Sequence, residues 1–402
     1  MLVVGGTYSE RCATPWRDVT AGSGMRAAAL LRTVDDALRL VSARSPADSE
    51  VYDSAANAYG VNVTWIERSG PVGFDYFTPL STPAITGRSV RLLGDSRTED
   101  DDAALVFGMI EGRPSVNAGS VVFDPQQPRE LSGLDLNGIS AERVAVVLNS
   151  AETAAISETV DVYDGPRRIL EHDRVEVVVT KRAMRGAIVT TATDQRVISP
   201  RRTSSVWPIG SGDAFAAGFA WAWAKGGADP FDAAEIGSRV AAQWCSNATF
   251  AVPAAVFSEE ADVGEAVPVN DGRVYLAGPF FTLAERWLVD LCRSALGTHV
   301  FSPLHDVGRR TPIDLAADIA QADLDGLRGC DAVLALIDRS DPGTIFEAGW
   351  ATDSGVGVVA YGEMVDESAK TMLTGSGATI TADLSSAVYL AVWAAMTRAA
   401  QR

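Results

Sequence analysis

The sequence predicts an α/β protein of two domains. Apolar runs of strand length alternate with helical segments in both halves of the chain, and 402 residues exceed the usual size of one domain. The composition, with 47% apolar and 21% charged residues, is that of a globular protein. Residues 252–271 contain prolines, an acidic run and an Asn-Asp-Gly turn, which is typical of a linker. We therefore expect one domain over residues 1–251 and a second, smaller domain with a doubly wound parallel sheet over residues 272–402.

The net charge and the cysteines limit the partners and the compartment. A formal net charge of -18 opposes contact with a phosphate backbone, so we expect a small-molecule substrate and no nucleic acid. The four cysteines are scattered without a C-x-x-C pair, which favours buried free thiols over disulfides or a metal site. No apolar run reaches the roughly 18 residues that a membrane-spanning helix needs. These features predict a cytoplasmic protein that does not bind membranes.

The first half opens with strand and helix signals. Residues 2–4 form an apolar run before two glycines, and residues 22–40 have the apolar stripe of a helix that starts at glycine. Residues 61–67 and 74–79 alternate apolar and polar side chains, which predicts a small sheet, exposed on one face, that can serve as a lid. The acidic run 99–102 is interpreted as a solvated loop.

Buried strands and long helices come next. Residues 145–148 and 175–180 are apolar enough for strands that are covered on both faces. Residues 213–225 and 230–246 predict two long helices. Together with the opening strand and helix, this order indicates a mainly parallel sheet covered by helices.

The sequence VWPIGSGDAF, residues 206–215, carries the chemical signal of this half. Gly210 and Gly212 allow a tight turn that aims backbone N–H groups at an anion, and the helix that follows adds its positive N-terminal end. Asp213 is then expected beside a bound phosphate, where it can take a proton from a hydroxyl. A glycine pair before a helix is also compatible with an ordinary loop.

Residues 1–250 resemble the ribokinase-like PfkB carbohydrate kinase family. The turn at Gly210–Asp213 matches the anion hole and catalytic base of the family, and NSAE, Asn149 to Glu152, matches its N-x-x-E magnesium motif. The segment 180–186 lies where the nucleotide-binding turn of the family is expected. The resemblance implies a ribokinase-like fold with a β lid, with ATP and Mg²⁺ as cofactors. The implied cofactor contacts are Gly210, Ser211, Gly212, Thr180 and Gly186, with Asn149 and Glu152 at the metal.

Two positions depart from this family pattern. Trp207 occupies the place where many members have an aspartate that helps to bind a monovalent cation, and we expect it to weaken dependence on potassium. Arg26 lies near the place where the sugar-binding helix often has asparagine. The anion-stabilising turn, the base and the magnesium-associated acid are nevertheless present. The half is therefore interpreted as an active kinase, or else as a domain retained only to bind a nucleoside or nucleotide.

The second half is organised around residues 331–349, DAVLALIDRSDPGTIFEAG. Residues 332–337 predict a buried parallel strand, and Asp341 can cap the following helix with proline at its first position. Ligands of parallel sheets bind beyond the carboxyl ends of strands, so Asp338, Asp341 and Glu347 are expected near a pocket. Neighbouring carboxylates suit glycosidic chemistry, although a simple helix cap and a solvated glutamate explain the same residues.

Three ordered motifs make residues 271–380 resemble the nucleoside 2-deoxyribosyltransferase family. They are RVYLAGPFF at 273–281, ADLDG at 322–326 and DPGTIFEAG at 341–349. The resemblance implies Glu347 as nucleophile, Tyr275 as the residue that positions it, and Asp323 and Asp341 as acids around the base and the sugar. The implied substrate contacts are Gly278, Phe280 and Lys370. Lys370 lies in a late family segment that often reaches the sugar 5′ position of a neighbouring subunit, so a homo-oligomer is also implied.

These resemblances predict a bifunctional enzyme of nucleoside or nucleotide salvage. One domain would cleave an N-glycosidic bond or transfer a deoxyribosyl group, without a cofactor, and the other would be an ATP-dependent sugar or nucleoside kinase. The alternative is a nucleotide-binding regulatory protein with a non-catalytic kinase-like domain. The sequence leaves open the base, the sugar, the choice between transferase and hydrolase, and the order of the two reactions.

Overall fold

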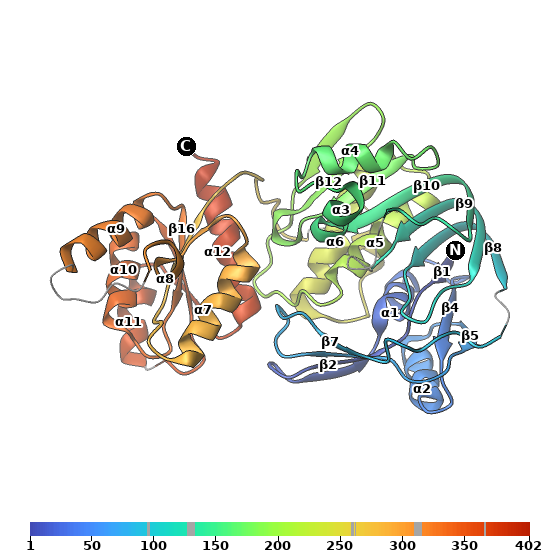
Figure 1. The fold of residues 1–402 in the computed structure, drawn as a ribbon, viewed down its shortest axis with the longest axis horizontal. Coiled ribbons are helices and arrows are strands. Elements are labelled where there is room, and N and C mark those ends of the chain that lie inside the picture. The colour runs from blue at the N-terminus through green and yellow to red at the C-terminus, as the bar shows by residue number, and fades with distance from the viewer. Residues whose placement is uncertain (95–96, 127–132, 259–260, 262, 309–315, 366) are drawn as a thin grey trace. The chain divides into compact units, whose positions relative to one another are not determined.

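A computed structural model describes residues 1–94, 97–126, 133–258, 261, 263–308, 316–365 and 367–402 (Figure 1). The chain divides into two compact units, one of Met1–Thr203 and Trp207–Glu265, the other of Ser204–Val206 and Ala266–Arg402. Each unit has its own sheet and its own hydrophobic core. The predicted class, α/β with two separate sheet domains, is confirmed.

The first unit is built on a nine-stranded sheet in the order β13-β12-β11-β10-β9-β8-β1-β4-β5. All neighbours from β11 to β5 pair in parallel, while β12 and β13 add an antiparallel edge. The strands are β1 Leu2–Val4, β4 Arg39–Arg44, β5 Val63–Glu67, β8 Thr98–Phe107, β9 Ser115–Asp124, β10 Ile139–Asn149, β11 Val177–Lys181, β12 Ala187–Thr190 and β13 Gln195–Ile198. The expected strands at 2–4, 145–148 and 175–180 lie inside this sheet.

Helices cover both faces of the large sheet. Val3 and Leu105 face a core shared with α1, α2, α5 and α6, whereas Leu2 and Val106 face a second core shared with α3 and α4. The helices are α1 Gly22–Leu31, α2 Ser49–Tyr59, α3 Ser150–Ser157, α4 Asp164–Leu170, α5 Ser211–Ala220 and α6 Pro230–Asn247. A π-helical turn, Trp221–Lys225, extends α5, so the two long helices predicted near 213–225 and 230–246 are present. Short 3-10 turns occupy Ala183–Arg185 and Ala254–Phe257.

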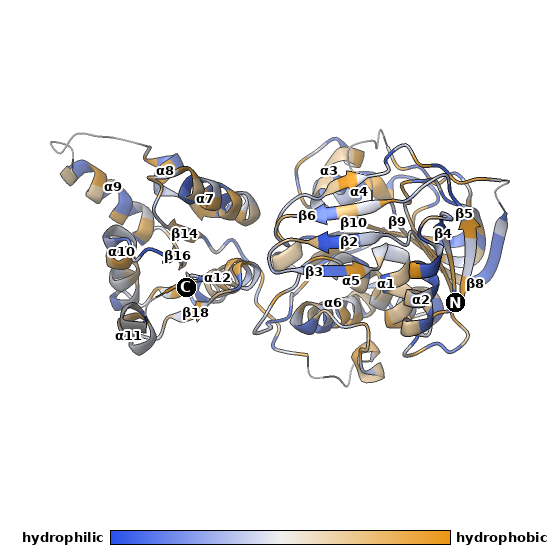
Figure 2. Cartoon of the chain, turned by 90° about the horizontal axis from the view of Figure 1, so that it is seen from below, coloured by the Kyte–Doolittle hydropathy of each residue, from blue (hydrophilic) through white to orange (hydrophobic). Residues whose placement is uncertain are grey.

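A separate four-stranded sheet forms the expected small β layer of this unit. Its order is β3-β2-β6-β7, with β3 Arg17–Thr20, β2 Ser9–Cys12, β6 Gly73–Tyr76 and β7 Ala84–Thr86. Strands β2 and β3 consist mostly of hydrophilic residues (Figure 2), which gives them no apolar run to detect. The sequence prediction of this sheet therefore missed β2 and β3, and it missed the short β7 as well.

Three local predictions for this unit are wrong. Residues 63–67 belong to β5 at the edge of the large sheet, because a strand exposed on one face has the same alternation in either sheet. The helix expected over 22–40 ends at Leu31, since Asp35 accepts hydrogen bonds from the N-terminal ammonium and from the Ala37 N–H, both at 3.0 Å, and so fixes a turn before β4. The acidic run 99–102 is part of β8 rather than a loop, and within it Glu99 pairs with Arg39 and Asp101 pairs with Arg39 and the N-terminal ammonium.

The second unit is a doubly wound parallel sheet, as predicted. The strand order is β15-β14-β16-β17-β18, and the direction of the order reverses at β14. Helices α7 and α12 pack against the sheet and against each other, and helices α10 and α11 pack against the sheet as well. The elements are β14 Val274–Ala277, α7 Leu283–Leu296, β15 Val300–Phe301, α8 Pro303–Asp306, α9 Ala316–Arg328, β16 Ala332–Leu336, α10 Pro342–Asp353, β17 Gly357–Tyr361, α11 Glu367–Gly375, β18 Thr379–Thr381 and α12 Leu384–Ala399. Ligands of such sheets bind at the reversal point, here beyond the carboxyl ends of β14 and β16.

The cysteines and the helices bear on two features considered from the composition. All four cysteines are buried and free of disulfides. Among the helices of the described ranges, none combines the length and apolarity needed to cross a membrane.

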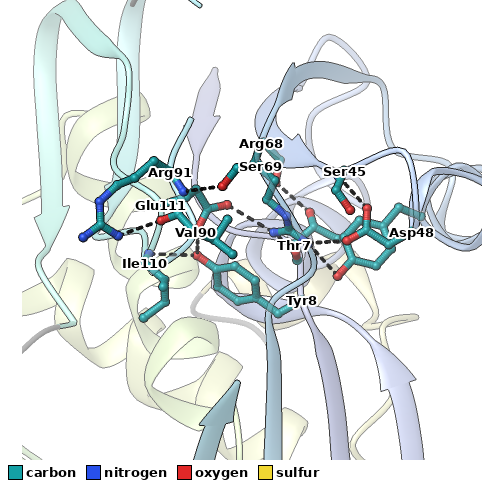
Figure 3. A network of polar contacts seen from close by, with 12 residues as sticks. Thr7, Tyr8, Ser45, Asp48, Arg68, Ser69, Val90, Arg91, Ile110 and Glu111 are labelled. Carbon is teal, nitrogen blue, oxygen red and sulfur yellow. Dashed lines mark hydrogen bonds and ion pairs between the residues drawn. The ribbon is translucent and has the colours of Figure 1, made fainter. Parts of the chain in front are cut away.

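Within the first unit, a buried ion network fixes the connection between the large sheet and the small sheet (Figure 3). The fully buried Arg68 donates to Asp48 at 2.6 Å, to Glu111 at 3.2 Å and to the Thr7 carbonyl at 3.1 Å. The Tyr8 hydroxyl donates to the other oxygen of Glu111 at 2.8 Å. Because Thr7 and Tyr8 connect β1 to β2, the network fixes where the chain leaves the large sheet and enters the small one.

Replacing Arg68 should be strongly destabilising. Arg68→Met leaves the Glu111 carboxylate buried without its cation, which typically costs about 3–5 kcal/mol of unfolding free energy. The matched change Arg168→Met removes an exposed ion pair with Asp164 and should cost at most about 1 kcal/mol. Urea unfolding of the full chain measures both, and equal losses would contradict this account.

Candidate active sites

The first site lies at the N-terminus of α5. Gly210 precedes this helix with φ of 83°, and a Cβ at Gly210 would come within 2.1 Å of the Arg26 side chain, so both backbone and space require glycine. Asp213 lies in the first turn, where backbone N–H groups have no acceptor within the helix. The turn from Gly210 to Asp213 therefore presents N–H groups and a carboxylate at the same place.

Both carboxylate oxygens of Asp213 have hydrogen-bond donors. Arg26 donates to Oδ2 at 2.5 Å, and the Gln126 amide donates to Oδ1 at 2.7 Å. The buried Arg26 also pairs with Glu10 on β2, so it joins the small sheet, α1 and α5. Gln126 was not found from the sequence, because no motif surrounds it.

A mostly buried lysine lies next to the same turn. The ammonium of Lys181, at the end of β11, pairs with Asp124 at the end of β9, and a Cβ at Gly212 would lie 3.3 Å from Lys181 Nζ. Burial raises the pKa of Asp124 to about 7, against the effect of Lys181. Asp124 Oδ1 is buried and has no hydrogen-bond partner within the described ranges. Neither residue belongs to a sequence motif. Each is the last residue of a buried strand, however, and this position could have identified both from the sequence.

The residues predicted at magnesium make a helix cap. Asn149 Oδ1 accepts the Glu152 N–H at 2.9 Å, and Glu152 Oε2 accepts the Asn149 N–H at 2.7 Å, which is a capping box at the start of α3. Glu152 is nevertheless buried, and it lies close enough to Lys181 for its negative charge to raise the pKa of that lysine. In the part of the chain that the structure describes, no group of three or more His, Cys, Asp or Glu residues is arranged to hold a metal ion.

The predicted nucleotide-binding residues lie at the carboxyl end of β11. Thr180 is buried, and its hydroxyl is 3.0 Å from that of Thr153. Gly186 has φ of 74°, and a Cβ there would come within 2.0 Å of the Ile198 carbonyl oxygen. Gly186 therefore shapes the turn between β11 and β12, whereas Thr180, next to Lys181, contacts α3.

The second site is centred on Tyr275 and Glu347, from β14 and α10. The Tyr275 hydroxyl donates to Glu347 Oε1 at 2.5 Å. The Tyr275 ring stacks on Phe301 with centroids 5.5 Å apart, and a Cβ at Gly326 would come within 2.3 Å of the Phe301 ring. The glycine of the ADLDG motif thus makes room for the ring that supports Tyr275.

Burial, with help from neighbouring acids, raises the pKa of Glu347 to about 7. The hydrogen bond from Tyr275 lowers this pKa, and the charges of Asp323 and Asp341 raise it. Asp341 caps α10 by accepting the Thr344 N–H at 2.9 Å, with Pro342 at the first position as predicted. Asp341 therefore both caps the helix and acts on Glu347.

Asp323 is the third acid near Glu347. Its Oδ1 is buried without a hydrogen-bond partner in the described residues, and burial raises its pKa. Asp338, which was expected at the pocket, accepts the Met364 N–H at 2.8 Å and so holds the loop after β17. The structure thus brings together acids from two of the sequence motifs, on α9 and α10.

The three predicted substrate contacts lie on different elements. A Cβ at Gly278 would come within 2.9 Å of Leu336, so the chain leaving β14 packs closely on β16. Phe280 is half-buried, with its ring 5.4 Å from that of Phe281. Lys370 lies on α11, and the hydrogen bonds described for Tyr275 and Glu347 do not include it.

Family comparisons match both halves of the chain. Residues 142–253 match the pfkB family carbohydrate kinase, and residues 274–380 match nucleoside 2-deoxyribosyltransferase. Both resemblances drawn from the motifs are confirmed, and together they support a fused enzyme of nucleoside metabolism. No curated protein sequence matches the chain.

Several solved kinase structures are similar to the chain. Ribokinase from Thermotoga maritima is 16% identical, covers 61% of this chain and 92% of its own, and has a TM-score of 0.45. A nucleoside kinase from Burkholderia thailandensis in complex with ADP-inosine is 14% identical, with 64% and 93% covered and a TM-score of 0.49. Nucleoside kinase from Methanocaldococcus jannaschii is 13% identical, with 60% and 90% covered and a TM-score of 0.43.

The carboxyl group of Glu347 should titrate near pH 7 rather than in the ordinary glutamate range. Tyr275→Phe removes a hydrogen bond to the charged form and should raise the pKa. Asp341→Asn removes a negative charge while asparagine still caps α10, and should lower the pKa. Carbon-13 NMR of labelled glutamate, assigned with Glu347→Gln, measures the three midpoints. Shifts in the same direction in both variants would contradict this electrostatic account.

Proposed function

We propose that the chain is a bifunctional enzyme of nucleoside or nucleotide salvage. A glycosidic domain over residues 272–402 cleaves an N-glycosidic bond or transfers a deoxyribosyl group, and a kinase domain over residues 1–251 phosphorylates a sugar or nucleoside with ATP. The observation that carries the proposal is the hydrogen bond from Tyr275 to Glu347, at the sheet edge where ligands of this fold bind.

Glu347 is the nucleophile of the glycosidic reaction. Its ionised oxygen forms a bond to the anomeric carbon while the bond from that carbon to the base nitrogen breaks, giving a glycosyl ester of Glu347. Tyr275 aims the carboxylate through its hydroxyl. Since the attacking form is ionised, turnover should increase as the pH rises through the pKa of Glu347, about 7.

Asp323 assists the departing base. Burial favours its protonated form, which can donate a proton to the base as the glycosidic bond breaks. Attack on the ester by a second base gives transfer, and attack by water gives hydrolysis. Both outcomes release Glu347 as a carboxylate and use the same residues.

The kinase reaction uses Asp213 as base. Asp213 takes the proton of the acceptor hydroxyl, for which one of its two present donors, Arg26 or Gln126, gives way or shares an oxygen. Lys181 and the N–H groups of the α5 turn would bind phosphate oxygens. Asp124, whose Oδ1 has no hydrogen-bond partner in the described residues, and Glu152 would hold a divalent cation together with phosphate oxygens. Magnesium-bound ATP, when present, supplies the transferable phosphoryl group.

A regulatory, nucleotide-binding role for the first half is the second candidate. It is favoured by the capping box, which uses the side chains of Asn149 and Glu152 for α3, and by the donors on both oxygens of Asp213. Tight nucleotide binding without ADP formation would distinguish it from the kinase. Lys370 as a contact of the sugar 5′ group, a homo-oligomeric state and a cytoplasmic location belong to the proposal as well.

Glu347→Ala should lower kcat for base release by at least about 10³-fold, because no ester can form. Chromatography of the free base after incubation with a panel of nucleosides and their monophosphates measures this. Asp325→Ala, which removes an exposed carboxylate of α9, is the control and should keep parent activity. If Glu347→Ala retains most of the activity while folded, the nucleophile is assigned wrongly.

Asp213→Asn should lower ATP-dependent phosphorylation by about 10²- to 10⁴-fold and leave ATP binding largely intact. ADP formation and calorimetric ATP binding are the two measurements. Asp232→Asn changes an exposed aspartate in the first turn of α6 and should alter neither. Unchanged ADP formation in Asp213→Asn would exclude Asp213 as the base.

A further inference from the structure

The charge around Glu347 is one-sided. Asp323 from α9 and Asp341 at the start of α10 both lie close enough to act on its carboxylate by charge. Within the described ranges, none of these three acids has a lysine, arginine or histidine at ion-pair distance. The arginine nearest to Asp341 in the sequence, Arg339, pairs with Glu285 at 3.6 Å instead. The described side chains of this site therefore gather negative charge that no protein cation compensates.

Two further carboxylates lie at the same edge of the sheet. Asp338 follows β16, and Glu363 follows β17, which pairs with β16 in parallel. Asp338 accepts the Met364 N–H at 2.8 Å, and Glu363 accepts the Tyr361 hydroxyl at 2.8 Å. Both donors are uncharged, so they leave the two negative charges in place. The acidic surface thus extends across the carboxyl ends of β16 and β17.

Two aromatic rings lie beyond the next carboxyl end, that of β14. Phe280 and Phe281 follow this strand with ring centroids 5.4 Å apart, and Phe281 is exposed. An aromatic ring offers a flat face on which a base can stack, and its negative face attracts a cation. The pair therefore suits a flat ring that carries positive charge.

We propose that the second site acts on N-glycosides whose base is a cationic heteroaromatic ring, such as an N-alkylated purine or a pyridinium. The inference rests on the proposed glycosidic function and names its substrate class. Attraction to Asp323, Asp341 and Glu347 would hold the charged ring, and Phe280 would stack on it. A neutral base of the same shape leaves the acids uncompensated and binds less tightly.

A cationic base also changes what the reaction requires. Glu347 forms a bond to the anomeric carbon while the bond from that carbon to the ring nitrogen breaks, and the electron pair of the broken bond neutralises the ring. The base leaves as a neutral molecule, so it needs no proton from Asp323. Water then attacks the ester, releases the sugar and the Glu347 carboxylate, and gives its second proton to solvent.

The binding test uses two compounds of similar shape that lack a cleavable N-glycosidic bond. They are the carbocyclic analogue of nicotinamide riboside, a cation, and benzamide riboside, its uncharged counterpart, each in ribo and 2′-deoxyribo form. Calorimetry with the full chain should show the cation binding at least about tenfold more tightly. Asp341→Asn keeps the α10 cap and should weaken only the cation, about three- to tenfold. Asp325→Asn, which alters an exposed acid paired with Arg328, should change neither affinity.

The turnover test compares guanosine with 7-methylguanosine at about pH 6, where the methylated base is cationic, again with both sugars. Base release relative to the uncatalysed rate should be at least about tenfold higher for the methylated compound. Asp323→Asn should lower release from guanosine about 10²-fold, because a neutral base needs a proton, and release from 7-methylguanosine less than about threefold. Chromatography of the free base measures all four rates.

The outcomes separate this inference from the function on which it rests. Equal affinities, tighter binding of benzamide riboside, or a cation preference that survives Asp341→Asn would overturn the inference, and base release from guanosine would still uphold the glycosidic function. A cation preference that depends on Asp341, without base release from any nucleoside, would keep the cation site and reject the function. An equal loss of both substrates in Asp323→Asn would contradict the proposed departure of a neutral base.

Discussion

The geometry of the first site depends on one buried guanidinium. Arg26 lies between Glu10 on the small sheet and Asp213 on α5, and is packed 5.1 Å from the Trp244 ring. Removing it would leave two buried carboxylates facing each other without a cation, which is far more costly than breaking an exposed pair. The position of the proposed base and the position of the small sheet are therefore set by the same side chain.

Sequence reasoning succeeded where a local pattern determines the structure. The apolar strands and the cap at Asp341 follow from burial and backbone chemistry. Motif order predicted that Tyr275 and Glu347 lie together, and they are hydrogen-bonded, while their catalytic roles stay predictions. It failed for β2 and β3, whose hydrophilic residues are held by pairing with distant strands. Gln126 was missed for a related reason, because it meets Asp213 only through the tertiary fold. No local pattern encodes such contacts.

The three motifs of the second unit form one packing arrangement. Gly326 leaves space for Phe301, Phe301 supports the Tyr275 ring, and the Tyr275 hydroxyl fixes Glu347. A side chain at Gly326 would displace the Phe301 ring and, through Tyr275, the Glu347 carboxylate. The sequence shows the order of the motifs, but only the structure gives the reason why the second motif contains glycine.

The two sites hold their central carboxylates in opposite electrostatic states. Asp213 has a cation as partner, so its negative charge is compensated before any substrate arrives. Among the described residues, Glu347 has only a neutral hydroxyl as hydrogen-bond donor, and two acids lie nearby, so its negative charge is destabilised until a positive centre forms next to it. An oxocarbenium-like carbon is such a centre, and attraction to it is greatest in the transition state. The second unit is thereby suited to glycosidic chemistry, whereas the first is suited to positioning a neutral hydroxyl.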